Sequence, residues 1–217
     1  MSLEPAKRRR EQSRADARRV ILDATEALLV DGGYERFSMR KLVDRCGYSA
    51  PTIYHYFGDK PGLLDALLEE RLQLLVGDLR RVSLGSDPVA NMRATSRAFA
   101  HFGLKNPSHY FLLTVPRAND TVPPPAAEEA RTILAQPMSD LFDQGRLHFD
   151  DLDEARQVLW TFMHGLISLQ LSRPNEEWAP DLVDHAIEAM IRGCVRPERN
   201  GHAHSSNANA APARSTQ

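Results

Sequence analysis

The chain lacks the features that mark secreted and membrane-spanning proteins. Its 217 residues include two cysteines, Cys46 and Cys194, too few for a disulfide framework or a zinc cluster, so we expect two buried apolar thiols. No apolar run approaches the roughly 20 residues that cross a bilayer. The basic start Lys7 to Arg10 is followed by charged residues and not by the apolar stretch of a signal peptide. The sequence predicts a cytoplasmic protein without a membrane partner.

β-branched residues are also scarce. Val, Ile and Thr total 25, against 51 Leu and Ala, and unbranched or small side chains lose little rotamer freedom in a helix. With 42% hydrophobic and 26% charged residues the balance is globular, and the length suits one large domain or two small ones. We therefore predict an all-α fold.

Apolar residues recur every three or four positions in about nine segments, each of which predicts a helix. The expected spans are 14–31, 38–46, 50–56, 59–85, 87–106, 110–115, 126–145 with a bend at Pro137, 150–172 and 181–194. The proline-rich segment 117–125 predicts a loop. The polar segment 196–217 predicts a disordered tail.

The charge is distributed unevenly. Residues 1–60 carry 12 Lys and Arg against 9 Asp and Glu, whereas the rest carries 15 against 20. Seven cations lie between Lys7 and Arg19, facing only Glu11 and Asp16. Such a segment suits DNA phosphates, because each neutralised phosphate releases counterions. The alternative is a plain solvated tail, and either way we expect residues 1–13 to form a flexible basic arm.

Two short predicted helices have the spacing of a helix-turn-helix. Ser38–Cys46 and Ala50–Tyr56 are separated by three residues with Gly47 at the turn, and Ser38 and Ser49 are suitable N-caps. A helix of about seven residues is roughly 10 Å long, which suits a major groove about 12 Å wide. We expect the second helix to enter that groove.

The side chains around this motif are suited to DNA. Small or polar groups that can face base edges occur in the second helix, and groups that can bind phosphate surround it. The base-edge candidates are Ser49, Ala50, Thr52 and His55; the phosphate candidates are Ser38, Tyr54, Tyr56 and Lys60; Arg40 can reach either. The alternative for the two tyrosines is packing in the small N-terminal core, which is the role we expect for Phe57.

The run FSMRKLVDRCGYSAPTIYHYFGDKPGLL, from Phe37 to Leu64, resembles the DNA-binding segment of the TetR family of bacterial transcriptional regulators. The likeness covers residues 14–64 and includes a first helix that ends in Gly-Gly, the cap Ser38, the Tyr-x-Tyr-Phe signature and Asp59-Lys60. The resemblance implies a homodimer that places one recognition helix per subunit into double-stranded DNA at an inverted repeat, with residues 14–58 as the DNA-binding domain.

The resemblance also implies a role for each matched residue. Those expected to hold phosphates are Ser38, Ser49, Tyr54, Tyr56 and Lys60. Those expected near bases are Arg40, Ala50, Pro51, Thr52 and His55.

The rest of the chain, residues 59–195, corresponds in this resemblance to a bundle that binds a small ligand and dimerises through segments 150–172 and 181–194. Trp160, His164 and Gly165 resemble the WHG type of TetR C-terminal domain. Aromatic and soft residues are the pocket candidates, although such residues also fill ordinary helical cores. They are Phe99, Phe102, Tyr110, Phe111, Phe142, Trp160, Met163 and His164.

The sequence contains no catalytic motif. A Gly-rich phosphate loop, His-Glu-x-x-His and Gly-x-Ser-x-Gly are all absent, and no histidine cluster has metal spacing. We expect no catalytic residue, metal or cofactor. The hypothesis is a nucleoid-associated repressor released from a palindromic operator by a small-molecule effector; the alternatives are an activator, a ligand-independent regulator, an all-α enzyme and a protein-interaction module.

Overall fold

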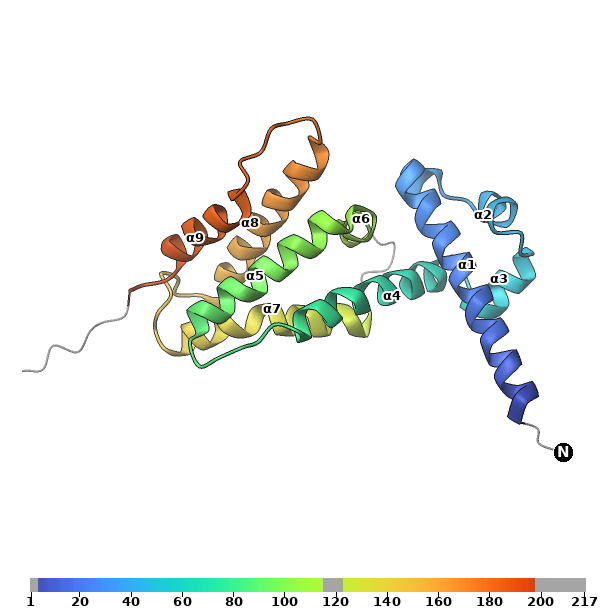
Figure 1. Cartoon of the computed structure of the whole chain (residues 1–217), viewed down its shortest axis with the longest axis horizontal. Helices are drawn as coiled ribbons and strands as arrows, with labels where there is room; N and C mark the ends of the chain where they lie inside the picture. Colours follow the sequence, from blue (N-terminus) through green and yellow to red (C-terminus); the bar gives the residue numbers. More distant parts are fainter. Residues whose placement is uncertain (1–3, 115–122, 198–217) are drawn as a thin grey trace, which may run out of the picture.

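The computed structural model describes residues 4–114 and 123–197. Within these ranges the chain forms nine α-helices, and its only strand-like pairing is an isolated bridge between Leu147 and Val195. The all-α prediction is confirmed. The helices, labelled in Figure 1, are α1 (Glu4–Arg36), α2 (Met39–Cys46), α3 (Ala50–Phe57), α4 (Lys60–Arg80), α5 (Pro88–Lys105), α6 (Pro107–Thr114), α7 (Pro125–Asp143), α8 (Leu152–Ser172) and α9 (Leu182–Cys194).

Side-chain caps fix the starts of α2, α3 and α4. Ser38 accepts from the Lys41 amide, Ser49 from the Thr52 amide and Asp59 from the Gly62 amide, so each cap satisfies a backbone donor that the helix cannot. Gly47 ends α2 in the left-handed conformation, at φ 74°, which a glycine adopts without steric cost. The predicted helix-turn-helix caps and turn are confirmed.

The start of α1 corrects the predicted boundary. The helix begins at Glu4, so the described part of the expected flexible arm is helical instead. Strong helix formers dominate this stretch, and two side-chain contacts at i,i+4 spacing support it: Lys7 with Glu11 at 4.0 Å and Gln12 with Asp16 at 2.9 Å. The charge run therefore lies on the first turns of a long helix.

Other helix ends differ from the prediction by a few residues. Helix α1 kinks at Gly33, where φ is 70°, near the predicted end, and one more turn follows. Helix α4 ends at Arg80, before the predicted residue 85, and Leu84 beyond it is 49% exposed. Helix α6 starts at Pro107, since proline fits a first helical turn. Most of the predicted loop and tail lies outside the described residues.

Two hydrophobic cores meet along α4. Its Leu63 and Leu67 pack in the N-terminal core with α1, α2 and α3, whereas Leu72, Leu75 and Leu79 pack in the C-terminal core. The N-terminal core therefore continues past residue 58, the predicted end of the DNA-binding domain. Helix α4 is shared by both parts and so links them, and α6 also reaches the N-terminal core through Leu112.

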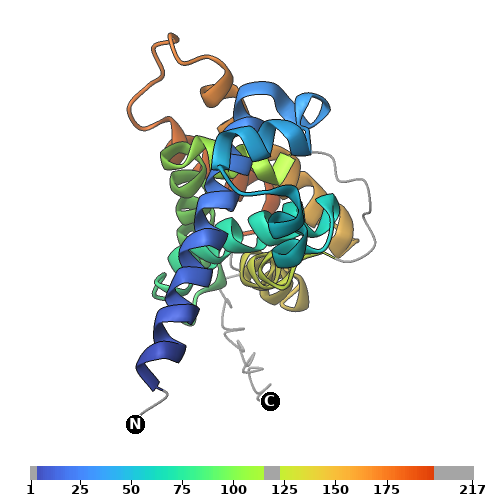
Figure 2. The same cartoon turned by 90° about the vertical axis from the view of Figure 1, so that its right-hand side faces the viewer.

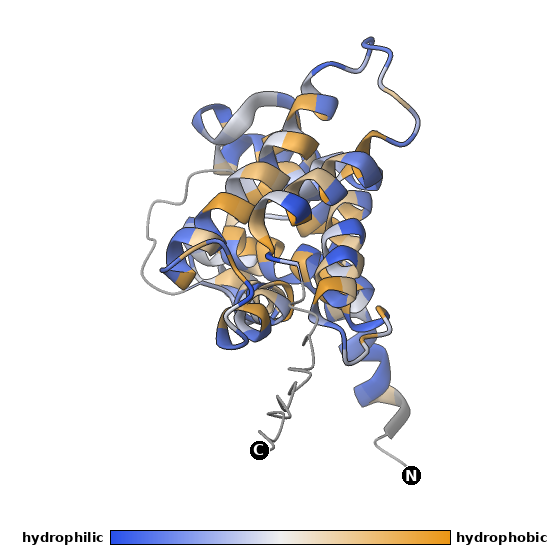
Figure 3. Ribbon diagram, turned by 90° about the vertical axis from the view of Figure 1, so that its left-hand side faces the viewer, coloured by the Kyte–Doolittle hydropathy of each residue, from blue (hydrophilic) through white to orange (hydrophobic). Residues whose placement is uncertain are grey.

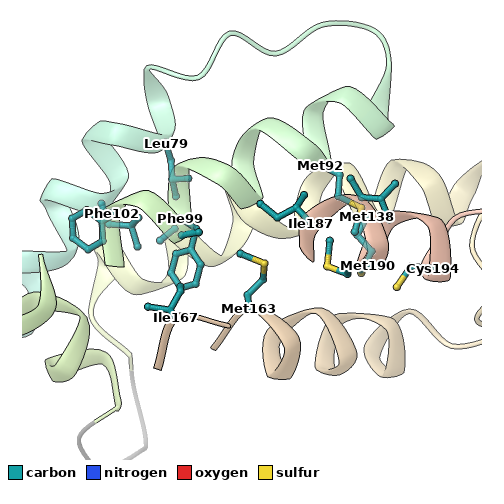
Figure 4. Close-up of a cluster of buried hydrophobic side chains, with 14 of the residues drawn as sticks. Leu79, Met92, Phe99, Phe102, Met138, Met163, Ile167, Ile187, Met190 and Cys194 are labelled. Atoms are coloured by element: carbon teal, nitrogen blue, oxygen red, sulfur yellow. The ribbon is translucent and has the colours of Figure 1, made fainter. Parts of the chain in front are cut away.

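Helix α5 is the centre of the C-terminal bundle. It contacts α4, α6, α7, α8 and α9, and its inner side faces a sulfur-rich core (Figure 4). Sulfur side chains fill irregular gaps well, and those buried here are Met92, Met138, Met163, Met190 and Cys194. Burial raises the pKa of the Cys194 thiol. The prediction of a buried thiol is confirmed for Cys194, whereas Cys46 is half-buried.

None of the described helices is both long and apolar enough for a membrane span.

Candidate DNA-binding surface and effector cavity

Helix α3 is anchored on one side and exposed on the other. Ile53 and Phe57, one turn apart, are buried in the N-terminal core. Pro51, Tyr54 and His55 lie on the exposed side. The helix thus presents polar and aromatic groups outward while its own packing is complete, which is the arrangement that a recognition helix needs.

The hydroxyl groups at the start of α3 are held by one another. Ser49 Oγ lies 2.8 Å from Thr52 Oγ1 and accepts from the Thr52 amide at 3.3 Å. A hydroxyl has one donor and two acceptor positions, so the pair keeps hydrogen-bonding capacity for a ligand. Ser38 accepts from the Lys41 amide at 3.4 Å in the same way.

The predicted phosphate ligand Lys60 lies against two aromatic rings. Its Nζ is 4.4 Å from the ring centroid of Tyr34 and 5.1 Å from that of Phe37. Cation–π attraction fixes the ammonium at the start of α4, where its N–H groups can still donate to a ligand. The aromatic at Phe37, part of the motif in the sequence, therefore also positions a cation.

Two contacts of this surface were not predicted from the sequence. The Arg18 guanidinium lies 4.8 Å from the ring centroid of Phe57, linking α1 to the end of α3. A Cβ on Gly62 would lie 2.2 Å from the Phe57 carbonyl oxygen, so only glycine allows α4 to start so close to α3. Each contact joins residues of different helices, and periodicity within one helix gives no signal for such a contact.

The structure gathers the predicted DNA-contact residues on α3 and on the helix starts beside it. Six lie on or directly before α3, namely Ser49, Ala50, Pro51, Thr52, Tyr54 and His55, and Tyr56 follows half-buried. Ser38 and Arg40 lie at the start of α2 and Lys60 at the start of α4. The individual roles at phosphate or base stay predictions.

A cavity of about 640 Å³ lies between α5, α7 and α8, within the size range of small-molecule sites. Three predicted pocket residues line it: Phe99, Trp160 and Met163. Leu134, Ala135 and Leu159 are the other apolar residues of the wall.

The other five pocket candidates do not line this cavity. Phe102 and Tyr110 are buried in the core, Phe142 is packed against it, and Phe111 is exposed on α6. The ring of His164 packs against that of Trp160, with ring centroids 4.0 Å apart. A role for these five in binding a ligand stays a prediction, because aromatic type alone does not distinguish core packing from a cavity wall.

The rim of the cavity carries paired charges that a search for aromatic residues does not find. Arg131 pairs with Glu128 at 2.6 Å. Arg156 pairs with Asp153 at 2.9 Å and donates to Ser139 Oγ at 3.1 Å. The cavity thus combines an apolar wall with a polar entrance whose charges are balanced.

A polar network lies next to the cavity. The Tyr110 hydroxyl lies 2.7 Å from His164 Nδ1 and 3.1 Å from Ser168 Oγ. Burial lowers the pKa of His164 and raises that of Tyr110. His164 Nε2 is buried without a hydrogen-bond partner among the described residues, and such a setting disfavours the charged imidazolium.

An ion network joins α1, α4 and α6 between the DNA-binding part and the bundle. The Arg71 guanidinium lies 2.5 Å from Asp23, 2.7 Å from Glu26 and 2.7 Å from Glu70. His109 of α6 lies 3.4 Å from Glu26, and burial lowers the pKa of His109.

No group of three potential ligand side chains among the described residues is placed to hold a metal ion.

A capped helix-turn-helix followed by a helical bundle with a cavity places the protein in the class of DNA-binding regulators that carry both parts on one chain. Residues 21–67 match the family described as "Bacterial regulatory proteins, tetR family". Residues 92–194 match the family "Tetracyclin repressor-like, C-terminal domain". The chain belongs to the TetR family of transcriptional regulators. The narrower resemblance to the WHG type is not confirmed by these matches.

Curated relatives are similar over parts of the chain. The HTH-type transcriptional repressor KstR of Rhodococcus jostii is 33% identical over a match of 103 residues, and the match covers 39% of this chain and 48% of that protein. The HTH-type transcriptional activator FasR of Mycolicibacterium smegmatis is 32% identical over 90 residues, 41% of each chain. The matched region thus spans less than half the length of these relatives.

Solved structures show the same fold over most of the chain. A TetR family transcription regulator from Marinobacter aquaeolei superposes with a TM-score of 0.69 at 18% identity, over 88% of this chain and 100% of that one. SmeT, the repressor of the multidrug efflux pump SmeDEF of Stenotrophomonas maltophilia, superposes with a TM-score of 0.63 at 20% identity, over 82% and 90%.

Proposed function

We propose that this protein is a homodimeric repressor that occupies an inverted-repeat operator and leaves it when a small molecule fills the cavity between α5, α7 and α8. The observation that carries the proposal is the exposed face of α3, which is built onto a complete core and ringed by groups that can hold phosphates. An activator is the second candidate, because FasR, one of the similar proteins, is named an activator.

DNA recognition divides between two groups of side chains. Thr52 and His55 on α3 offer a hydroxyl, a methyl and a ring nitrogen to base edges in the major groove. Tyr54, Tyr56 and Lys60 hold phosphates and so set the register of the helix on the duplex. Phosphate contacts supply most of the affinity, whereas the base contacts supply the preference for one sequence.

The outward faces of α8 and α9 supply the dimer surface. Val158 and Leu169 of α8 are exposed apolar residues, and Gly165 between them has open space around its Cα. On α9 the exposed positions include Ala189 and Gly193. Small and apolar residues on neighbouring helices allow close approach of a two-fold partner. Figure 3 views the molecule from the end at which these helices lie.

Release by the effector passes through α4. Its first turns pack with α3, and its later turns pack on α7 beside the cavity. A shift of α4 changes the separation of the two recognition helices in the dimer. Changing the ratio of the released form to the DNA-binding form from 1:99 to 99:1 requires the effector to prefer the released form about 10⁴-fold, or roughly 5.5 kcal/mol. The two cavities of a dimer can supply this preference together.

The test is selection of bound duplexes from a random library by the purified full chain, followed by mobility shift and footprinting. We expect an inverted repeat whose half-sites are about one helical turn, or a multiple of it, apart. Absence of sequence preference, or binding as a single protomer, would overturn the proposal. A reporter placed behind the selected operator separates repression from activation.

A further inference from the structure

The N-terminal turns of α1 extend past the rest of the DNA-binding part. The helix starts at Glu4, residues 6–16 are exposed, and burial begins at Ala17. Figures 1 and 2 both show this end of α1 projecting beyond α3, and Figure 3 shows it as largely hydrophilic. The core therefore does not account for these turns, which have no packing role of their own.

One face of this extension continues the side of α1 that packs on the core. Ile21, Thr25 and Leu29 are buried on that side. Toward the N-terminus, the positions that share this face at intervals of three and four residues are occupied by Arg18, Arg14, Arg10 and Lys7. This row of residues along α1, the stripe, is apolar where it packs on the N-terminal core and cationic where α1 extends beyond that core.

Arg18 shows which way the stripe faces. Its guanidinium lies over the ring of Phe57, the last residue of the recognition helix. The face that holds Arg14, Arg10 and Lys7 is therefore directed to the same side of the molecule as α3. Glu11 lies 4.0 Å from Lys7 and balances its charge, so Arg10 and Arg14 are the cations that we take to be available for a partner.

We propose that the N-terminal extension of α1 is a second DNA-contact surface, in which Arg10 and Arg14 hold backbone phosphates of the duplex beside the half-site that α3 reads. This inference rests on the proposed DNA binding and adds a contact to it. Charge complementarity and continuity with α3 favour duplex DNA as the partner. The contact adds affinity without sequence preference, because phosphates carry no base information.

The dimensions fit a contact outside the half-site. Residues 4–17 form about 20 Å of helix at about 1.5 Å per residue, which equals about six base pairs at about 3.4 Å per step. A duplex trimmed to the operator would leave the extension without phosphates, whereas a duplex with longer flanks would supply them.

The experiment measures the affinity of the full chain for the selected operator in two duplexes, one trimmed and one with about ten further base pairs, roughly one helical turn, on each side, over a range of salt concentrations. The test variant is R10A/R14A. The matched control is R9A/R19A, which removes the same charge from exposed positions of the same helix that lie off the stripe. Circular dichroism checks that α1 stays helical in both.

We expect the wild-type protein and R9A/R19A to bind the long duplex more tightly, and R10A/R14A to bind both lengths alike. The salt slope of R10A/R14A on the long duplex should fall by about 0.9 for each phosphate that the variant no longer neutralises. Equal reductions in the two variants would mean a diffuse charge effect, and an unchanged affinity of R10A/R14A would mean that the face serves another partner; either result overturns the proposal. Binding of the trimmed operator reports on α3 separately, so failure of the proposed function would appear there.

Discussion

The Nε of Arg71 in α4 lies 2.7 Å from Oε2 of Glu26 in α1. Both side chains are largely buried, with 10% and 12% of their surface exposed. The pair fixes the angle between the DNA-binding part and the helix that runs into the bundle. A movement of α4 must therefore either carry α1 with it or break this ion pair.

Replacing Arg71 by alanine should lower the free energy of unfolding by about 3 kcal/mol, because Glu26 is then left buried without its partner. Urea unfolding followed by circular dichroism measures the change. The matched control is R80A on the same helix, whose partner Glu129 lies near the surface and whose removal should cost less than about 1 kcal/mol. Equal effects of the two variants would contradict a structural role for the junction.

The sequence predicted the helix-turn-helix closely because its signals are local. Ser38, Ser49 and Asp59 cap the helices that follow them, and each cap joins residues that are close neighbours along the chain. The Arg71 network joins residues 45 and 48 positions apart. Periodicity within a helix carries no information on such a pairing, so the junction is visible only in the folded chain.

Lys60→Ala should weaken binding to every duplex alike and reduce the salt slope by about one unit per subunit, because we propose that its ammonium holds a phosphate and not a base. Removing the cation from the rings of Tyr34 and Phe37 should cost only about 0.5–1 kcal/mol of stability. Salt titrations of binding to specific and random duplexes measure the first effect. Lys60→Arg is the control that keeps the charge; an effect confined to one operator sequence would contradict the phosphate role.

His55→Ala should change the base preference at one operator position and leave the salt slope unaltered. The side chain is exposed on α3, its ring lies edge-on to Tyr56 at 5.8 Å, and a base contact typically contributes about 1–3 kcal/mol of discrimination. Repeating the duplex selection with the variant measures the preference. If the selected sequences are the same, His55 does not read a base.

Stability should fall as the solution is acidified from about pH 7.5 to below the ordinary histidine pKa of about 6.5. Burial lowers the pKa of His164 in the folded chain. Over this pH window the unfolded chain therefore binds more protons than the folded chain, and the free energy of unfolding falls as the pH falls. Above the window the group contributes no pH dependence. His164→Phe should flatten the dependence of unfolding free energy on pH, as measured by urea unfolding at a series of pH values.

His109 contributes in the same direction, since burial lowers its pKa as well. The double variant H164F/H109Q should therefore be flatter than either single variant. A pH profile of H164F that matches the wild-type profile would show that His164 takes up its proton as readily in the folded chain as in the unfolded one.

The cavity was only partly predictable, again for a physical reason. Phe99, Trp160 and Met163 line it, yet Phe102 and Tyr110 have the same apolar spacing and fill the core instead. The periodicity of apolar residues predicts which side chains of a helix point into the bundle. Whether those side chains contact a neighbouring helix or line a cavity depends on the distance between the helices. That distance is set by close approaches such as the one at Gly103, where an added Cβ would lie 2.9 Å from Ile167 Cγ2.

Gly165→Arg should abolish the dimer while leaving the protomer folded. An added Cβ at Gly165 meets no atom within 4 Å, and replacing a helical glycine favours the helix by about 0.8 kcal/mol, so the substitution has no cost within one chain. In the dimer the arginine would lie between the two copies of α8 and keep them apart. Sedimentation velocity measures the oligomeric state, and the variant should bind one half-site with a Kd that no longer depends on the second. The control is Gly85→Arg, an identical change at an open position in the loop before α5, which should remain dimeric. A dimeric G165R protein would place the two-fold contact on another surface, and the two recognition helices would then have a different separation.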